Sequence, residues 1–198
     1  MEGPLLIPII LAAGASQRMG QAKFFLPVGA ETLLRRALRA ATALGSPVVI
    51  VTGPADREIR EHLADWPGLE FAFNAAAATG MGSSIAVGIR AALGYGPRGF
   101  LVMLADQPGM DAAALGRHAA AFADNPDRII ATQYPQRAGV PAVFPARYAE
   151  QLLALNGAEG AQSLIAAAGP EVLGITFARP PEDIDTPEDY ARYLEDNL

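Results

Sequence analysis

The fold is most tightly constrained by the stretch Leu11-Ala12-Ala13-Gly14-Ala15-Ser16-Gln17-Arg18-Met19-Gly20, which follows an apolar run and precedes Lys23. The apolar run, residues 7–11, is rich in isoleucine, as expected of a buried strand, and helical periodicity begins near residue 32. Gly14 and Gly20 bound a turn of mostly small side chains, where backbone amides stay accessible to an anion. The stretch therefore predicts a strand that ends in an anion-binding turn, with a helix after it.

The alternation of strand and helix patterns continues along the whole chain. Predicted strands cover residues 7–11, 48–52, 70–73, 99–104, 129–132, 142–144 and 172–177. Predicted helices cover residues 32–44, 55–63, 83–93, 111–122, 146–155, 161–168 and 187–194. Alternation of this kind indicates parallel βα units, and uninterrupted apolar strands are typical of a sheet covered by helices on both faces.

We therefore expect an α/β fold: a three-layer αβα sandwich with a doubly wound, mostly parallel sheet of the Rossmann-like kind. Residues 135–145 interrupt the βα rhythm and are expected to carry a small antiparallel excursion of the sheet. The small-residue stretch 75–78 is expected to be a loop. No composition shift marks a domain boundary, so the sequence predicts a single domain over residues 1–198.

Composition narrows the class of partner and metal. A formal net charge of -6 disfavours binding to a nucleic-acid backbone, which needs a clustered basic face. The chain has no apolar stretch of membrane-spanning length and no basic leader, so we expect a cytoplasmic protein that does not enter a membrane. With no cysteine and two histidines, any metal is expected to be hard and bound by oxygen atoms.

The basic residues point to the turn after the first strand. Fourteen of the fifteen are arginine, and Lys23 is the single lysine in the chain. In a doubly wound sheet this turn meets the positive end of the following helix, a position that suits phosphate groups. A helix terminus contributes only about 0.3–1 kcal/mol per charge, so a triphosphate also needs cations, which Arg18 and Lys23 supply here. The alternatives are a turn that binds nothing and an ordinary surface lysine.

A second candidate site residue is Asp106, at the end of the most continuous apolar strand. Residues 100–104 lead directly into Ala105-Asp106-Gln107-Pro108, a proline-marked turn. A carboxylate there faces the same crevice as the first turn, and Mg²⁺ commonly takes one or two carboxylates together with substrate phosphates. Asp106 is therefore a predicted magnesium ligand. The alternative is that it caps the turn, with Asp111 capping the next helix.

Two further segments contribute candidates. Gly80-Met81-Gly82-Ser83-Ser84 is a tight turn into a helix, with hydroxyls and amides for a nucleobase or ribose, or else a plain capping turn. In the stretch from Asp183 to Asp189, Thr186, Pro187 and Asp189 form a conventional helix start. Asp183 and Asp185 precede that helix, and residues two apart in an extended segment share a face, so both are candidates for one site.

These motifs, in this order and spacing, resemble the molybdenum-cofactor nucleotidyltransferases, and within them the branch that acts as a molybdopterin cytidylyltransferase. The resemblance spans nearly the whole chain. It also includes Gly139-Val140-Pro141 and the run from Asp185 to Asp189. Relatives that use GTP usually have Leu-Ala-Gly-Gly at the start of this turn, and Ala13 takes the place of the first of those glycines here. The resemblance therefore implies that the nucleotide substrate is CTP.

The resemblance implies a site and a set of partners. It assigns catalysis to Arg18, Lys23 and Asp106, and magnesium to Asp106. The position of Asp185 before the last helix adds it as the candidate for a second magnesium ligand. Nucleotide binding is assigned to Leu11, Ala12, Ala13, Gly14, Arg18, Gly20, Lys23, Gly82 and Ser83. The implied partners are a nucleoside triphosphate, a phosphate-bearing acceptor such as molybdopterin, and a molybdoenzyme or its chaperone.

The sequence departs from the family pattern on the acceptor side. Ala77 and Thr79 replace an aromatic and an acidic residue, and the usual Gly-Asp-x-Gly-Ala-Arg reads Gly-Ala-Glu-Gly-Ala-Gln over residues 157–162. Two other functions therefore stay open. One is nucleotidyl transfer to a sugar or alcohol phosphate, and the other is a non-catalytic accessory protein that binds nucleotide or cofactor.

Overall fold

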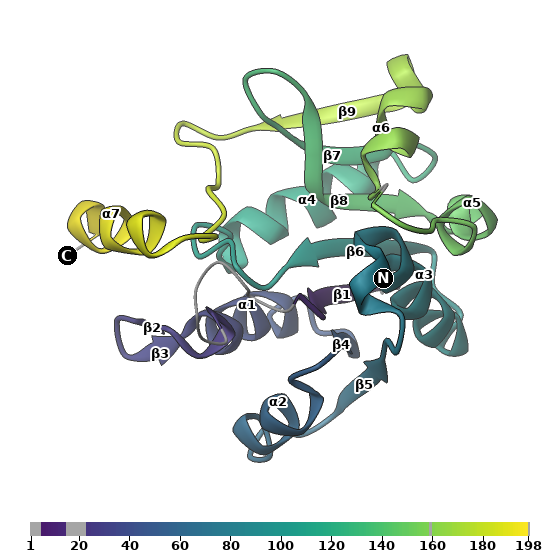
Figure 1. The fold of residues 1–198 in the computed structure, drawn as a ribbon. Helices are drawn as coiled ribbons and strands as arrows, with labels where there is room; N and C mark the ends of the chain where they lie inside the picture. Colours follow the sequence, from purple (N-terminus) through teal and green to yellow (C-terminus); the bar gives the residue numbers. More distant parts are fainter. Residues whose placement is uncertain (1–4, 15–22, 159, 198) are drawn as a thin grey trace.

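A seven-stranded sheet organises the molecule, whose computed structural model describes residues 5–14, 23–158 and 160–197 (Figure 1). Its strands are β1 (Leu6–Ala12), β4 (Val48–Thr52), β5 (Leu69–Phe73), β6 (Gly99–Leu104), β7 (Ile129–Gln133), β8 (Ala138–Pro145) and β9 (Val172–Thr176). Their order across the sheet is β5-β4-β1-β6-β8-β7-β9. All neighbouring pairs are parallel except the two that involve β8, which is antiparallel to β6 and β7. The mostly parallel sheet and its antiparallel excursion are confirmed, and β8 is longer than predicted.

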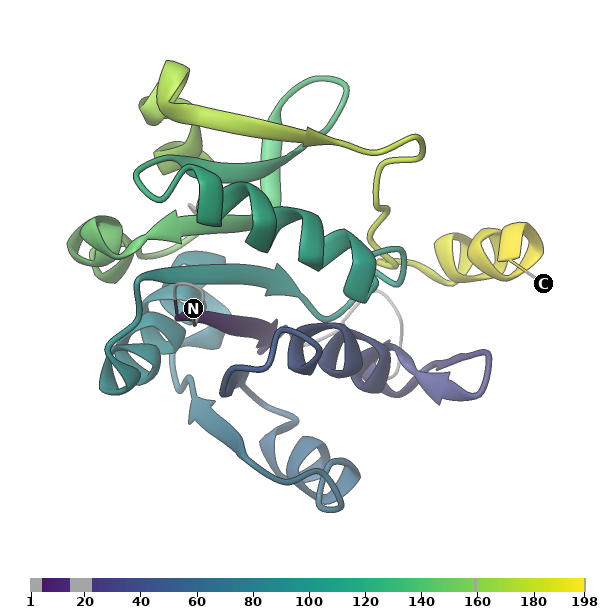
Figure 2. The ribbon, with the colours of Figure 1, turned by 180° about the vertical axis from the view of Figure 1, so that it is seen from behind.

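Helices cover both faces of the sheet. They are α1 (Leu33–Thr42), α2 (Asp56–His62), α3 (Met81–Ala92), α4 (Ala112–Asp124), α5 (Ala149–Leu153), α6 (Gln162–Ala168) and α7 (Pro187–Asn197). In Figure 1, α3, α5 and α6 lie in front of the sheet, and Figure 2 shows α1 and α4 on the opposite face. The predicted three-layer sandwich is confirmed.

The two hydrophobic cores follow from strand alternation. On β1, Ile10 and Ala12 pack with α1, α2 and α4, while Ile9 and Leu11 pack with α3, α5 and α6. Every residue of β1 and β6 is buried. Successive side chains point to opposite faces, so a strand between two helical layers must be apolar throughout. This is why the central strands could be recognised from composition alone.

Several boundaries differ from the predicted ones. Helix α3 begins at Met81 rather than residue 83, with Gly80 as its N-cap residue, and a 3-10 turn (Ala77–Thr79) occupies part of the predicted loop. The last predicted strand and the fifth predicted helix are shorter, since β9 ends at Thr176 and α5 is preceded by a 3-10 turn (Ala146–Tyr148). A small hairpin, β2 (Pro27–Val28) and β3 (Glu31–Thr32), was not predicted, because two-residue strands carry no periodic signal.

The carboxyl end of β6 is crossed by the segment between β9 and α7, residues 177–186, which we call the C-terminal strap (Figure 1). The strap is anchored beyond the sheet, where Ile184 packs with Leu26, Val28 and Leu33, and Tyr190 and Tyr193 of α7 pack against the same group. The Tyr190 hydroxyl also donates a 2.6 Å hydrogen bond to the Pro27 carbonyl. No helix within the described ranges is long and apolar enough to cross a lipid bilayer.

Candidate active site

The first turn and the end of β6 meet through Lys23. Lys23 opens a 3-10 turn (Lys23–Phe25), and Phe24, which is buried in the core beneath α1, fixes the position of that turn. Lys23 is only 8% exposed. Its Nζ forms an ion pair with Asp106 and donates a 2.8 Å hydrogen bond to Asp185 Oδ1. The single lysine of the chain is therefore not an ordinary surface residue.

The C-terminal strap brings two carboxylates to this point. The Ile184 amide donates to the Asp106 carbonyl at 3.0 Å, which holds the strap beside the β6 turn. The Ile184 side chain is buried on the hairpin side, whereas Asp183 and Asp185 face the site. The alternation of an extended segment thus places both carboxylates on one face, as expected from the sequence. Thr186 and Asp189 make the predicted capping contacts at the start of α7.

The electrostatics of the site combine burial with an excess of negative charge. Burial alone would lower the pKa of Lys23, but the carboxylates of Asp106 and Asp185 outweigh it and raise the pKa above its ordinary value. Burial raises the pKa of Asp106, and the nearby Asp183 and Asp185 raise it further, against the opposing effect of Lys23. Two carboxylates thus contact the Lys23 ammonium group, and the charge of a third, Asp183, acts on Asp106; among the described residues this arrangement favours a further cation.

The residues present fit a divalent cation held together with substrate. Asp106 Oδ1 is buried and has no hydrogen-bond partner among the described residues. No group of three or more His, Cys, Asp or Glu side chains within those residues is arranged around one metal position. Mg²⁺ commonly binds through one or two carboxylates and completes its shell with water and substrate phosphates. Asp106 and Asp185 match that donor set, and in this structure the Lys23 ammonium group contacts both of them.

A hydrogen-bonded network that the sequence analysis missed lies next to the ion pairs. Gln107 Nε2 donates to Asp183 Oδ1 at 2.7 Å and to the Tyr134 hydroxyl oxygen at 3.1 Å. Tyr134 in turn donates to the Val140 carbonyl at 2.6 Å. Burial is the main reason why the pKa of Tyr134 is raised, and that of Asp183 as well. Gln107 was visible in the motif after β6, but Tyr134 carried no signal because only the folding of β7 brings it to the site.

The described part of the first turn is closely packed. Leu11, Ala12 and Ala13 are buried, and Gly14 is the last described residue before the gap. A Cβ atom on Gly53, at the end of β4, would lie 2.6 Å from the Ala13 carbonyl oxygen, so this approach requires glycine. Two residues assigned to the turn, Arg18 and Gly20, lie outside the described residues.

The segment from Gly80 to Ser84 uses its polar groups internally. Asn74 Nδ2 donates to the hydroxyls of both Ser83 and Ser84 at 2.9 Å, and Ser83 donates to the Gly80 carbonyl. The Gly82 amide donates to the Gly157 carbonyl at 3.1 Å. Gly80 has a φ of 130°, and a Cβ atom there would lie 2.2 Å from the same carbonyl oxygen. Both serine hydroxyls and the Gly82 amide thus have partners within the protein, and Gly80 rather than a serine is the N-cap residue of α3. The assignment of Gly82 and Ser83 to nucleotide binding stays a prediction.

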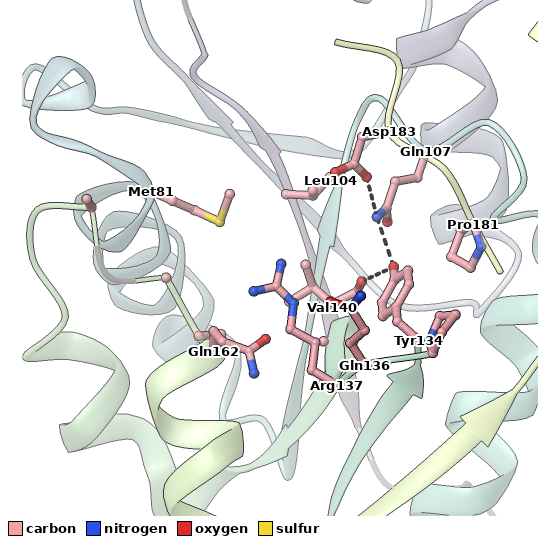
Figure 3. A pocket seen from close by; sticks show the side chains of 15 residues that line it. Met81, Leu104, Gln107, Tyr134, Gln136, Arg137, Val140, Gln162, Pro181 and Asp183 are labelled. Atoms are coloured by element: carbon pink, nitrogen blue, oxygen red, sulfur yellow. Dashed lines mark hydrogen bonds between the residues drawn. The ribbon is translucent and has the colours of Figure 1, made fainter. Parts of the chain in front are cut away.

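A pocket of about 620 Å³ opens beside the network (Figure 3). The β7–β8 turn, the start of α3, the loop before α6 and the C-terminal strap all contribute to its walls. Its lining is largely apolar, from residues such as Met81, Leu104 and Val140, with the amides of Gln107, Gln136 and Gln162 among them. Ala158 and Gln162, which depart from the family pattern, both line this pocket. The pocket therefore lies beside Gln107 and Asp183 and is large enough for a small molecule.

The sheet topology, the buried Lys23–Asp106 pair and the adjoining pocket define an α/β nucleotidyltransferase domain. The family described as the MobA-like NTP transferase domain matches residues 8–172 of the chain. The chain therefore belongs to this family.

Two curated relatives and one solved structure illustrate the similarity. The purine catabolism protein PucB of Bacillus subtilis is 31% identical, with 96% of each chain covered. The molybdenum cofactor cytidylyltransferase of Escherichia coli is 34% identical over 42% of this chain and 43% of its own. The crystal structure of Rv0371c from Mycobacterium tuberculosis superposes with a TM-score of 0.82 at 26% identity and covers 98% of this chain and 100% of that one. The same protein has been solved in complex with manganese, with a TM-score of 0.77, 26% identity and coverage of 96% and 98%.

Proposed function

We propose that this enzyme transfers CMP from CTP to a phosphate-bearing acceptor such as molybdopterin, with Mg²⁺ as cofactor and pyrophosphate as the second product. The observation that carries the proposal is the Lys23–Asp106–Asp185 cluster, which lies beside a pocket of about 620 Å³. The cluster offers charges for a triphosphate and a metal, and the pocket offers room for the acceptor. A cytoplasmic location and contact with a molybdoenzyme or its chaperone belong to the same proposal.

The nucleotide and the acceptor are supported by different observations. Ala13 is buried at the first turn, where the bulk of its methyl group favours the smaller pyrimidine base. The E. coli relative is described as a cytidylyltransferase for molybdenum cofactor, although the match covers less than half of each chain. The metal is supported by Asp106 Oδ1, which is buried and has no hydrogen-bond partner in the described part of the chain, and by the manganese complex of Rv0371c.

The reaction follows from the charges at the site. An oxygen of the acceptor phosphate attacks the α-phosphorus of CTP, the bond from that phosphorus to the bridging oxygen breaks, and pyrophosphate leaves with the bonding electrons. A phosphate monoester has a second pKa near about 6 and is mostly dianionic at pH 7, so no general base is needed. Catalysis then consists of positioning and charge neutralisation.

Each residue has a distinct part in this scheme. Lys23 binds the triphosphate, and Arg18 is expected to do the same. Asp106 and Asp185 would hold the metal, which would neutralise negative charge on the phosphates. Gln107 holds Asp183 in place through its 2.7 Å hydrogen bond and keeps this carboxylate at the pocket edge.

The test is a matrix of nucleoside triphosphates against acceptors, with Mg²⁺ present and pyrophosphate release as the readout. We expect CTP with molybdopterin to give the highest rate. A higher rate with a sugar phosphate or an alcohol phosphate would show that this compound, and not molybdopterin, is the acceptor. Tight triphosphate binding without pyrophosphate release from any pair would instead favour an accessory role.

Asp106→Asn provides the matching test of the metal site. The substitution keeps the size of the side chain but removes its charge, so Mg²⁺-dependent pyrophosphate release should fall by several orders of magnitude while the circular dichroism spectrum is retained. Asp111→Asn is the control, because Asp111 caps α4 through its 2.8 Å bond to the Ala114 amide and lies outside the cluster. Unchanged turnover in Asp106→Asn would remove this residue from the mechanism.

A further inference from the structure

Few charged side chains are described in the lining of the pocket, and they are of opposite sign. Among the lining residues that the structure describes, Arg137 is the one cation and Asp183 the one anion. Lys23, the nearest described cation of the catalytic cluster, is already in contact with Asp106 and Asp185. A negatively charged acceptor that enters the pocket therefore meets one described guanidinium group and, at the pocket edge, a carboxylate.

The β7–β8 hairpin directs Arg137 into the pocket. Residues 134–137 join the two strands, and the Tyr134 amide closes this short turn by donating to the Arg137 carbonyl at 2.9 Å. Residues 137 and 139 point to the same face of the hairpin. Position 139 is glycine, where a Cβ atom would lie 3.2 Å from the Tyr134 ring, and Figure 3 shows the Arg137 guanidinium in the region between Gln162 and Leu104.

The Arg137 guanidinium is available to a ligand. None of the hydrogen bonds and ion pairs found among the described residues involves this side chain, whereas most of the other described arginines are paired. The positive charge of Arg137 also acts on Asp183, another residue that lines the pocket. Burial raises the pKa of Asp183, and Arg137 is one of the groups that oppose this rise.

A guanidinium group suits a phosphate better than any other side chain does. Its planar fork donates two parallel hydrogen bonds to two phosphate oxygens, and these bonds are charge-assisted. The neighbouring carboxylates would otherwise repel a dianion and exclude it from the pocket. The positive charge of Arg137 on the pocket wall offsets this repulsion, and no ion pair found among the described residues joins it to the carboxylates proposed to bind the metal.

We propose that Arg137 binds the phosphate group of the acceptor and makes the enzyme select phosphate monoesters over the corresponding alcohols. The inference rests on the proposed function, since it takes the pocket as the acceptor site. It adds a specificity-determining residue that lies outside the motifs recognised in the sequence. Gln162, whose amide adjoins the same space, is then free to contact the neutral part of the acceptor.

The first experiment needs no turnover. Arginine side chains are modified with phenylglyoxal, and the extent at each position is measured by mass spectrometry with and without inorganic phosphate. Phosphate should slow modification of Arg137 but leave Arg98 unaffected, because Arg98 is exposed just before the amino end of β6, whereas the pocket lies at the carboxyl end of that strand. Equal rates at Arg137 with and without phosphate would overturn the proposal.

The second experiment separates the acceptor from the nucleotide. Loss of a hydrogen bond to a charged group predicts that Arg137→Ala raises the acceptor KM by about 10- to 100-fold, while the KM for CTP and kcat at saturating acceptor change little. Arg137→Lys should recover only part of the loss because an ammonium group cannot bind two oxygens in parallel. Arg98→Ala is the matched control and should behave as the wild type.

The two inferences fail in different ways. If the wild type releases pyrophosphate and Arg137→Ala leaves the acceptor KM unchanged, the role of Arg137 is wrong and the proposed function stands. If the wild type is inactive with every acceptor, the proposed function fails, and protection of Arg137 by phosphate still decides whether this residue binds an anion.

Discussion

At the scale of single residues, the Lys23–Asp106 pair sets both the stability and the chemistry of the site. Both residues are buried, with exposed fractions of 8% for Lys23 and 9% for Asp106. A buried ion pair contributes little net stability, yet loss of one partner leaves an uncompensated buried charge. We therefore expect this pair to be far more sensitive to single substitutions than to joint replacement.

Lys23→Met should reduce the free energy of unfolding at pH 8 by about 3–5 kcal/mol, measured by urea denaturation. Without the ammonium group, the already raised pKa of Asp106 rises further in the folded state. A group whose folded pKa is raised stabilises the protein below its unfolded pKa and loses that contribution as pH rises to the folded pKa. The cost of Lys23→Met should thus be smaller at pH 5 than at pH 8.

The joint variant Lys23→Met, Asp106→Asn is the control for this mechanism. Because the joint variant has no uncompensated buried charge, it should recover most of the stability lost at pH 8. The stability cost relative to the wild type should then be the same at pH 5 and pH 8. A loss that does not depend on pH would instead indicate that the packing of the lysine side chain is responsible.

At the scale of elements, the C-terminal strap determines the catalytic geometry from outside the sheet. Residues 183–185, near its end, alternate between the site and the hairpin, with Ile184 2% exposed against Leu26, Val28 and Leu33. The strap lies beyond residues 8–172, the part of the chain that the family match covers. Its anchoring therefore controls whether Asp183 and Asp185 reach the cluster.

Ile184→Ala should cost about 2–5 kcal/mol of stability because it empties a buried site, and it should also weaken metal binding by releasing the strap. Binding of Mn²⁺ in the presence of nucleotide, followed by electron paramagnetic resonance, measures the second effect. Ile184→Val should cost only about 0.5–1.5 kcal/mol and keep the affinity. If Ile184→Ala binds Mn²⁺ as well as the wild type does, Asp185 is not a metal ligand.

At the scale of the whole molecule, nucleotide binding should couple the two ends of the chain. The first turn and the strap are more than 160 residues apart in sequence, since Lys23 and Asp185 are separated by 162 positions. A ligand that bridges them binds only the folded state and stabilises it by mass action. Thermal unfolding is therefore a direct measure of which nucleotide the site prefers.

With Mg²⁺ present, CTP at about 100 times its dissociation constant should stabilise the protein by about 2.7 kcal/mol, and its melting temperature should rise by several degrees. GTP at the same concentration should produce a smaller shift. Asp106→Asn should lose the part of the shift that depends on Mg²⁺. An equal or larger shift with GTP would contradict the preference for CTP.

Much of the fold could be predicted because its signals are local. All seven strands of the main sheet were located, since burial on both faces requires continuous apolar runs such as residues 100–104. Lys23 and Asp106 were identified because each follows a strand of the central sheet. The assignment of a single domain over residues 1–198 stays a prediction.

What the sequence determined by itself is the α/β architecture and the presence of cations and carboxylates at the ends of β1 and β6. Only the tertiary structure decided how these groups are used. It paired Lys23 with Asp185, engaged Ser83 within its own segment, and brought Tyr134 and Arg137 to the pocket. The physical reason is that strand and helix patterns arise from contacts between near neighbours, whereas these pairings depend on where the β7–β8 hairpin and the C-terminal strap pack.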